Sequence, residues 1–181
     1  MKKATFLLVF VLLVLVTATA SAHRGARHFI VNLDPVNNSG VKGIAYLALG
    51  DDTLTVRVYA TGLEAGKVHP QHIHGHEQPA TQNNGNATCP TPAADVNNDG
   101  LVDVGEGVPF YGPVQLALTP FSTTPDGVLE YTQTFTDLSG LEPANTLQTK
   151  AIVLHGMTVG DSYVPSLPIA CGQIRPAPNG R

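Results

Sequence analysis

The chain has 181 residues, of which 43% are hydrophobic and only 13% are charged, and its formal net charge is −4 at pH 7. This length suits a single domain with a hydrophobic core of its own. A mildly acidic chain without a basic patch is a poor candidate for binding nucleic acid or anionic membranes, so metal ions and small molecules are the partners to expect.

The first 22 residues have the pattern of a secretory signal peptide. Lys2 and Lys3 precede an apolar run over residues 6–16, and small residues follow in an A-x-A pattern that ends at Ala22. The run is too short for an ordinary transmembrane helix, although an uncleaved anchor is the alternative. We therefore expect export, either by secretion or to the periplasm, and a mature domain over residues 23–181. Loss of the two lysines changes the formal charge from −4 to −6.

Short segments with a period of two predict an all-β domain. Residues 41–49 and 54–59 are predicted strands, and the turn signal Gly50-Asp51-Asp52 joins them into a hairpin. Turns that contain proline or glycine separate further predicted strands at residues 114–118, 129–135 and 150–155. Several short strands divided in this way favour an antiparallel sandwich or barrel.

Four histidines fall within eight residues: His69, His72, His74 and His76. Alternate residues of a strand point to the same side, so His72 and His74 would present both imidazoles on one face. Neutral imidazole is a ligand suited to copper and zinc, and the cluster therefore predicts a metal site. A chance cluster in a surface loop is the alternative, because part of the segment is turn-like.

Residues 77–109 lack apolar periodicity and are too long for a passive connection. Within them, residues 95–106 fit the twelve-residue calcium loop, with Gly100 at its sharp turn. The ligand positions are occupied by Asp95, Asn97, Asp99, Leu101 (through its backbone carbonyl), Asp103 and Glu106. An Asx-rich turn without an ion is the alternative, but it would leave four carboxylates crowded together without a cation.

Prolines flank this loop on both sides. Pro90 and Pro92 precede it and Pro109 follows it, which leaves little room for the paired helices of a regulatory EF-hand. We therefore expect a structural calcium ion and not a calcium switch.

Both cysteines, Cys89 and Cys171, lie in the part predicted to be exported. In an oxidising compartment such a pair is most simply a disulfide, and two free buried thiols are the alternative. Cleavage after Ala22 would also leave His23 as the first residue. Its amine and imidazole could chelate copper as in histidine-brace proteins, although a frayed terminus is the more common case.

Several segments resemble the copper/zinc superoxide dismutase family. They are Val41-Lys-Gly-Ile-Ala-Tyr, Val56-Arg-Val-Tyr-Ala-Thr-Gly-Leu-Glu-Ala-Gly, His72-Ile-His74, Ile152-Val-Leu-His155 and Ala170-Cys171-Gly172. The resemblance implies a Greek-key β-sandwich with copper held by His72, His74 and His155. It also implies a disulfide between Cys89 and Cys171. In a copper protein of this kind, His69 or His76 could add a fourth ligand or a hydrogen bond to one of the ligands.

The chain departs from that family in its middle. No histidine occurs between Glu77 and Leu154, so the usual zinc subloop looks replaced by the calcium loop and a zinc ion is not expected. Pro168 stands where the family places the arginine that guides superoxide. The resemblance therefore implies a mononuclear copper protein, with superoxide as a candidate substrate and efficient dismutation in doubt.

A second resemblance covers much of the same ground. Chordin-type (CHRD) domains carry a similar H-I-H-x-G segment and a later G-P-V strand, which Gly112-Pro-Val-Gln-Leu matches. This resemblance implies the same antiparallel β-sandwich class but a non-enzymatic extracellular module, stabilised by calcium and a disulfide. The sequence leaves the choice between the two functions open.

Overall fold

The computed structural model describes residues 25–76, 85–141 and 144–178. The predicted signal peptide and His23 lie outside these residues. None of the described helices has both the length and the hydropathy needed to cross a membrane.

The described residues form eleven strands and one α-helix. The strands are β1 (Arg27–Pro35), β2 (Lys42–Leu49), β3 (Leu54–Thr61), β4 (Lys67–Val68), β5 (Gln71–His74), β6 (Val114–Ala117), β7 (Thr123–Thr124), β8 (Val128–Phe135), β9 (Ala151–Val159), β10 (Ser162–Gln173) and β11 (Arg175–Pro176). The helix is α1 (Val104–Tyr111), and short 3-10 helices cover Pro92–Ala94, Ser139–Leu141 and Ala144–Thr149.

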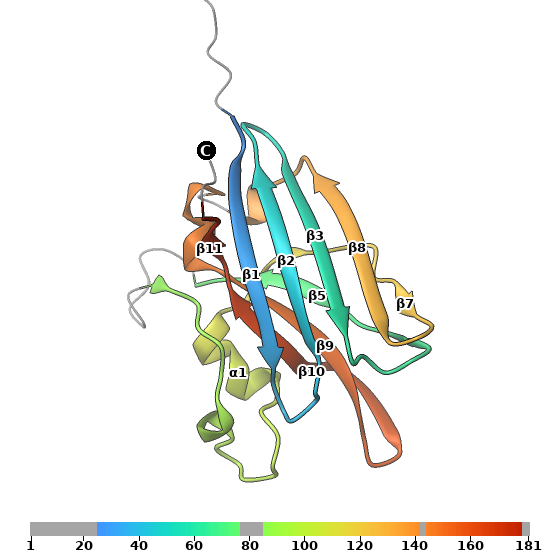
Figure 1. Ribbon diagram of the computed structural model, residues 1–181. Coiled ribbons are helices and arrows are strands. Elements are labelled where there is room, and N and C mark those ends of the chain that lie inside the picture. The colour runs from blue at the N-terminus through green and yellow to red at the C-terminus, as the bar shows by residue number, and fades with distance from the viewer. Residues whose placement is uncertain (1–24, 77–84, 142–143, 179–181) are drawn as a thin grey trace, which may run out of the picture.

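The main sheet is antiparallel throughout and has the strand order β6-β5-β9-β10-β1-β2-β3-β8, with β11 paired to β1. It curls so that β1, β2, β3 and β8 form one layer and β5, β9 and β10 lie behind them (Figure 1). Sequence-distant neighbours such as β3 with β8 and β10 with β1 give the crossovers of a Greek-key arrangement. The predicted all-β antiparallel class is confirmed.

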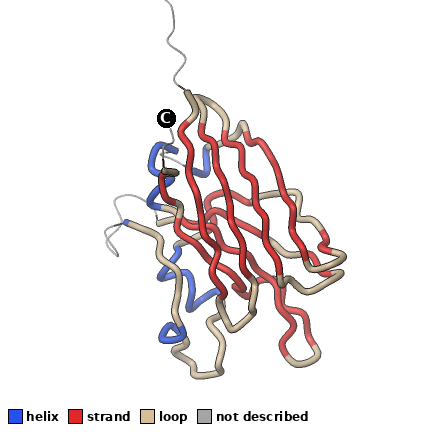
Figure 2. The backbone as a smooth tube through the Cα atoms, viewed as in Figure 1, coloured by secondary structure: helices blue, strands red, loops and turns tan. Residues whose placement is uncertain are grey.

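A single apolar core fills the space between the two layers because the strands alternate inward and outward residues. The clearest case is β3, in which every second residue from Leu54 to Ala60 is buried. The back layer contributes Ile73, Ile152 and Leu154 to the same core. A second, smaller cluster lies around Tyr111, Val153 and Cys171. In Figure 2 the α-helix lies beside the strands, whereas the 3-10 helices Ser139–Leu141 and Ala144–Thr149 contribute Leu141 and Leu147 to the main core.

The predicted hairpin is confirmed as β2 and β3, and the other three predicted strands correspond to β6, β8 and β9. Two long strands were not predicted. In β1 the signal was present, since Phe29, Val31 and Leu33 alternate with polar or half-buried residues. In β10, Pro165 and Pro168 lower the expectation of a strand because proline cannot donate to the hydrogen-bond ladder.

The helix α1 also differs from the expectation, because Pro109 lies inside it. Asp103 caps the first turn through a reciprocal capping box with Glu106, which satisfies two otherwise free backbone N–H groups. Proline has no N–H to donate to the carbonyl four positions earlier, here that of Gly105, so α1 accommodates Pro109 with one helical hydrogen bond fewer. Among the described residues, only the short 3-10 helix Pro92–Ala94 precedes the loop, so the helix pair of a regulatory EF-hand is not formed.

Candidate metal centre

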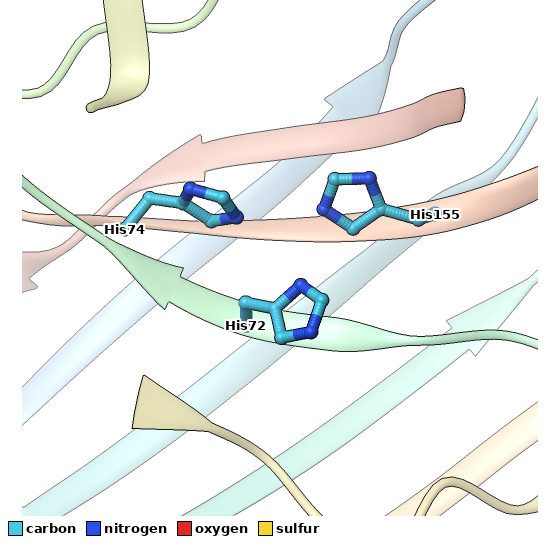
Figure 3. A group of neighbouring side chains, drawn as sticks. All are labelled: His72, His74 and His155. Atoms are coloured by element: carbon cyan, nitrogen blue, oxygen red, sulfur yellow. The ribbon is translucent and has the colours of Figure 1, made fainter. Parts of the chain in front are cut away.

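The pairing of β5 with β9 brings three histidines to one face of the sheet. His72 lies opposite Val153, while Ile73 between the two strand histidines points into the core. His72 and His74 therefore point to the outer side, and so does His155, two residues beyond Val153. Figure 3 shows two imidazoles reaching in from β5 and one from β9.

The three imidazoles face one another at metal-binding spacing. One nitrogen from each of His72, His74 and His155 lies within 4.8 Å of the others. The ring centroids are 5.1 Å apart for His72 and His155, and 5.6 Å apart for each of the other two pairs. The structure therefore gathers the three residues that the sequence and its resemblance selected as ligands, into a group that could hold a metal ion.

Backbone carbonyls fix the tautomers of two of the rings. Nδ1 of His74 donates to the carbonyl of Gly112 at 2.9 Å, and Nδ1 of His155 donates to the carbonyl of Ser166 at 2.8 Å. Since a carbonyl only accepts, Nε2 of each ring carries a lone pair when the imidazole is neutral. This is the arrangement that orients a metal-binding histidine in many proteins.

The nitrogens that remain are buried and have no hydrogen-bond partner among the described residues. They are Nε2 of His74, Nε2 of His155 and Nδ1 of His72. Leaving three polar atoms unpaired in one buried place is costly unless something binds them. The donor set therefore fits a metal ion.

Burial keeps the three imidazoles neutral. It lowers the pKa of His74 to about 4 and that of His155 to about 3, although their hydrogen bonds to backbone carbonyls act in the opposite direction. Burial also lowers the pKa of His72. Because only the neutral ring binds a metal, His74 and His155 stay competent for binding well below neutral pH.

Two aromatic rings flank the histidines. Tyr111, at the end of α1, packs edge-on against His74 with the centroids 4.6 Å apart. Phe121 packs edge-on against His72 at 5.4 Å. His74 and His155 are each only 3% exposed, whereas His72 is half-buried, so the centre opens toward solvent on the His72 side.

His69 and His76 do not belong to the three-histidine group. His69 is fully buried, with Nδ1 3.2 Å from the carbonyl of His155 and Nε2 3.1 Å from the carbonyl of Glu64. Nε2 of His76 lies 3.0 Å from the carbonyl of Phe110. His69 therefore supports the backbone of the third histidine, and His76 fastens the end of β5 to α1.

The segment over residues 158–167 belongs to the hairpin of β9 and β10 and takes part in the centre through the carbonyl of Ser166.

The disulfide between Cys89 and Cys171 is present, with the two Cα atoms 5.6 Å apart. It joins the segment leading to α1 to strand β10. Thr88 adds a backbone hydrogen bond to Phe110, so the disulfide and α1 together cover the histidine face.

In the loop over residues 95–106 the acidic side chains bind backbone N–H groups of the loop itself. The Asp95 carboxylate accepts from Asp99 at 3.2 Å and from Gly100 at 2.9 Å. The Glu106 carboxylate accepts from Val96, Asn97 and Asp103 at 2.8–3.1 Å. Within the described residues, the histidine triad is the one group of three or more histidine, cysteine, aspartate or glutamate side chains close enough to share an ion.

Comparison with known proteins gives no assignment: the chain matches no protein-family model and no curated protein.

Four residues that contact the three-histidine group were not predicted from the sequence: Tyr111, Gly112, Phe121 and Ser166. Tyr111, Gly112 and Phe121 come from segments distant from the histidines that they contact, and Ser166 lies across the β9–β10 hairpin from His155, so no local pattern marks them. The G-P-V match at Gly112 is the nearest signal, and it pointed to a strand.

Proposed function

We propose that this protein is an exported mononuclear copper protein whose metal is held by His72, His74 and His155. The observation that carries the proposal is the convergence of three buried, otherwise unpaired imidazole nitrogens within 4.8 Å. The signal-peptide pattern supports export, and the resemblance to the copper/zinc superoxide dismutase family supports copper.

The chemistry of the donors also supports copper. The group contains three neutral nitrogens and no carboxylate or thiolate, which favours a borderline transition metal over calcium or magnesium. Copper(II) heads the order of divalent affinities for such sites, and the half-buried His72 side would let a small molecule reach a bound ion.

Bound copper would supply one-electron chemistry, and superoxide dismutation is the reaction to assay first. His74 and His155 would hold the ion in place through rings fixed by Gly112 and Ser166. His72 is the ligand nearest to solvent. Dismutation consumes two protons for every peroxide formed, and Pro168 takes the place of an arginine that would attract the anion. We therefore place metal binding first and dismutase activity second.

We further propose that the loop over residues 95–106 binds a structural calcium ion. The complete set of ligand residue types at the twelve positions supports this. So does the capping box, which places Glu106 at the end of the loop and in the first turn of α1. A calcium-stabilised module without enzymatic activity is the second candidate function, favoured by Pro168 at the position of the guiding arginine.

The deciding experiment is elemental analysis of the purified mature protein, with a superoxide assay on the copper-loaded sample. We expect one copper per chain in the wild type and none in the His72→Ala/His74→Ala variant. His76→Ala is the matched control because His76 lies in the same segment but outside the group, and it should keep its copper. Full copper in the double variant would move the site elsewhere, with His23 as the next candidate. Wild-type protein that contains calcium but no copper would favour the calcium-stabilised module without enzymatic activity.

A further inference from the structure

We propose that Tyr111 is a positioning residue of the histidine centre: its ring holds His74 in the orientation for binding a metal, and its other end fixes that orientation to the first turn of α1. The inference rests on the proposed function in one respect, because the orientation matters for metal binding only if His74 is a ligand.

Two consecutive residues hold the imidazole of His74. The Tyr111 ring packs against it at an interplanar angle of 66°, with 4.6 Å between the centroids. The carbonyl of Gly112 accepts the Nδ1 proton at 2.9 Å. The hydrogen bond selects the tautomer but allows the ring to swing about it, and the tyrosine ring blocks that swing. Tyr111 is fully buried, so this contact is made away from water.

The far end of the Tyr111 ring is fixed by α1 itself. A Cβ atom at Gly107 would lie 2.3 Å from the phenolic oxygen and 2.5 Å from Cε1 and Cζ. The tyrosine therefore fills the space that a side chain at Gly107 would need. Gly107 directly follows Glu106, the last residue of the capping box, so the ring spans the distance from the start of α1 to His74.

The hydroxyl group itself has no assigned chemical task. It is buried and has no hydrogen-bond partner among the described residues. Burial, with the negative charge of Asp103, raises the pKa of Tyr111 above its ordinary value, so the phenol stays neutral. The contribution of Tyr111 is therefore the shape of its ring, and phenylalanine should replace it.

The other two ligands have different supports, which makes His74 the test case. His155 is held through Ser166 and lies next to buried His69, whereas His72 packs against the ring of Phe121. Groups that orient a metal ligand in this way typically change affinity by about 10–100-fold when they are removed.

The structure offers four variants that separate positioning from general packing. Tyr111→Phe keeps the ring, and Tyr111→Leu removes it. Gly107→Ala places a methyl group where the Tyr111 ring lies, while the tyrosine and all the histidines keep their identities. Gly105→Ala is its matched control, because it is in the same helix but its Cβ would meet only Asp103, at 3.2 Å. Leu47→Ala, in the main core, controls for loss of stability alone.

The first readout uses metal-free protein: the tautomer and line width of the His74 ring by ¹⁵N-resolved NMR. The second is the affinity for copper(II) ions by chelator competition, with the copper hyperfine coupling by EPR. We expect Tyr111→Leu and Gly107→Ala to give altered line widths of the His74 ring signals, copper affinity about tenfold weaker and a changed hyperfine coupling. Tyr111→Phe, Gly105→Ala and Leu47→Ala should match the wild type in all three.

The inference would be overturned if Tyr111→Leu and Gly107→Ala both gave the NMR spectrum of the wild type. It would also be overturned if Leu47→Ala changed the His74 signals as much as those two variants do. If Tyr111→Leu does not fold, Gly107→Ala decides alone. A wild-type protein that binds no copper would contradict the proposed function, while the metal-free NMR readout would still test whether Tyr111 orients His74.

Discussion

The side-chain amide of Asn37 pairs with both backbone groups of Val102, as a neighbouring strand would. Oδ1 accepts from the Val102 N–H at 2.7 Å, and Nδ2 donates to the Val102 carbonyl at 2.9 Å. The same Nδ2 also donates to the carbonyl of Pro168 at 3.0 Å. Since Pro168 lies opposite His155 in the β9–β10 pairing, Asn37 ties the 95–106 loop to the strand beside the third histidine.

Replacement of Asn37 by alanine should therefore be costly. Three hydrogen bonds are lost at about 0.5–1.5 kcal/mol each, so we expect about 2–4 kcal/mol less stability in chemical denaturation. Asn38→Ala is the matched control: its φ of 53° is close to the 56° of Asn37, so both alanines carry the same backbone strain. Equal losses in the two variants would show that the amide contacts contribute nothing.

Removing the negative charges of two predicted calcium ligands should abolish stabilisation by calcium and leave copper binding intact. We suggest Asp95→Asn with Glu106→Gln, which removes two of the negative charges and keeps one acceptor oxygen in each side chain for the backbone N–H groups that the two carboxylate oxygens bind in the wild type. Calcium at a hundred times its dissociation constant should stabilise the wild type by about 2.7 kcal/mol and the variant by none. The same calcium-induced rise in melting temperature in both proteins would remove the loop as the calcium site.

The buried Gln71 predicts a stabilising substitution. Its side chain is fully buried opposite Leu154 on the core side of β5, and neither amide atom has a partner among the described residues. Gln71→Leu should raise the free energy of unfolding by about 1–2 kcal/mol, since the unpaired amide is replaced by apolar atoms of similar size. Gln148→Leu, at an exposed position, should be close to neutral. A destabilised Gln71→Leu protein would show that the amide is satisfied in solution.

The stability of the metal-free protein should fall as the pH drops below about 6.5. In the unfolded chain His74 and His155 take up protons near that pH, whereas burial lowers their folded pKa values to about 4 and about 3. The unfolded state then binds more protons, and each histidine costs about 1.4 kcal/mol of stability per pH unit down to its folded pKa. Urea unfolding at pH 7.5, 6 and 5 measures this slope. The His74→Gln/His155→Gln variant should have a shallower one, and an unchanged slope would contradict the assignment.

Gly156, next to His155, should not tolerate alanine. Its φ is +107°, and an added Cβ would lie 2.0 Å from the hydroxyl of Tyr163 and 3.2 Å from Nδ1 of His69. We expect Gly156→Ala to lose about 3 kcal/mol or more, and to weaken copper binding because His69 and His155 shift together. Gly160→Ala, in the same hairpin with φ of +57° and open space around it, should lose only about 1–2 kcal/mol. Similar losses in both would mean that backbone strain alone matters.

The sequence by itself determined the fold class and most of the strands, because period-two alternation and turn residues are local signals. It also selected His72 and His74, since alternate residues of a strand must share a face whatever the strand packs against. His155 could be chosen only through a family resemblance. Nothing local distinguishes it from any other histidine in a strand.

Only the tertiary structure decided how the centre is built. The β5–β9 register brings His155 to His72, and a shift of one residue would have turned it into the core. The end of α1 brings Tyr111 and Gly112 to His74, and the β9–β10 hairpin brings Ser166 to His155. The contacts between β5, β9 and α1 join segments far apart in the chain, and the Ser166 contact depends on how the β9–β10 hairpin pairs. They depend on strand order and burial, which the pattern of single residues along a sequence does not encode.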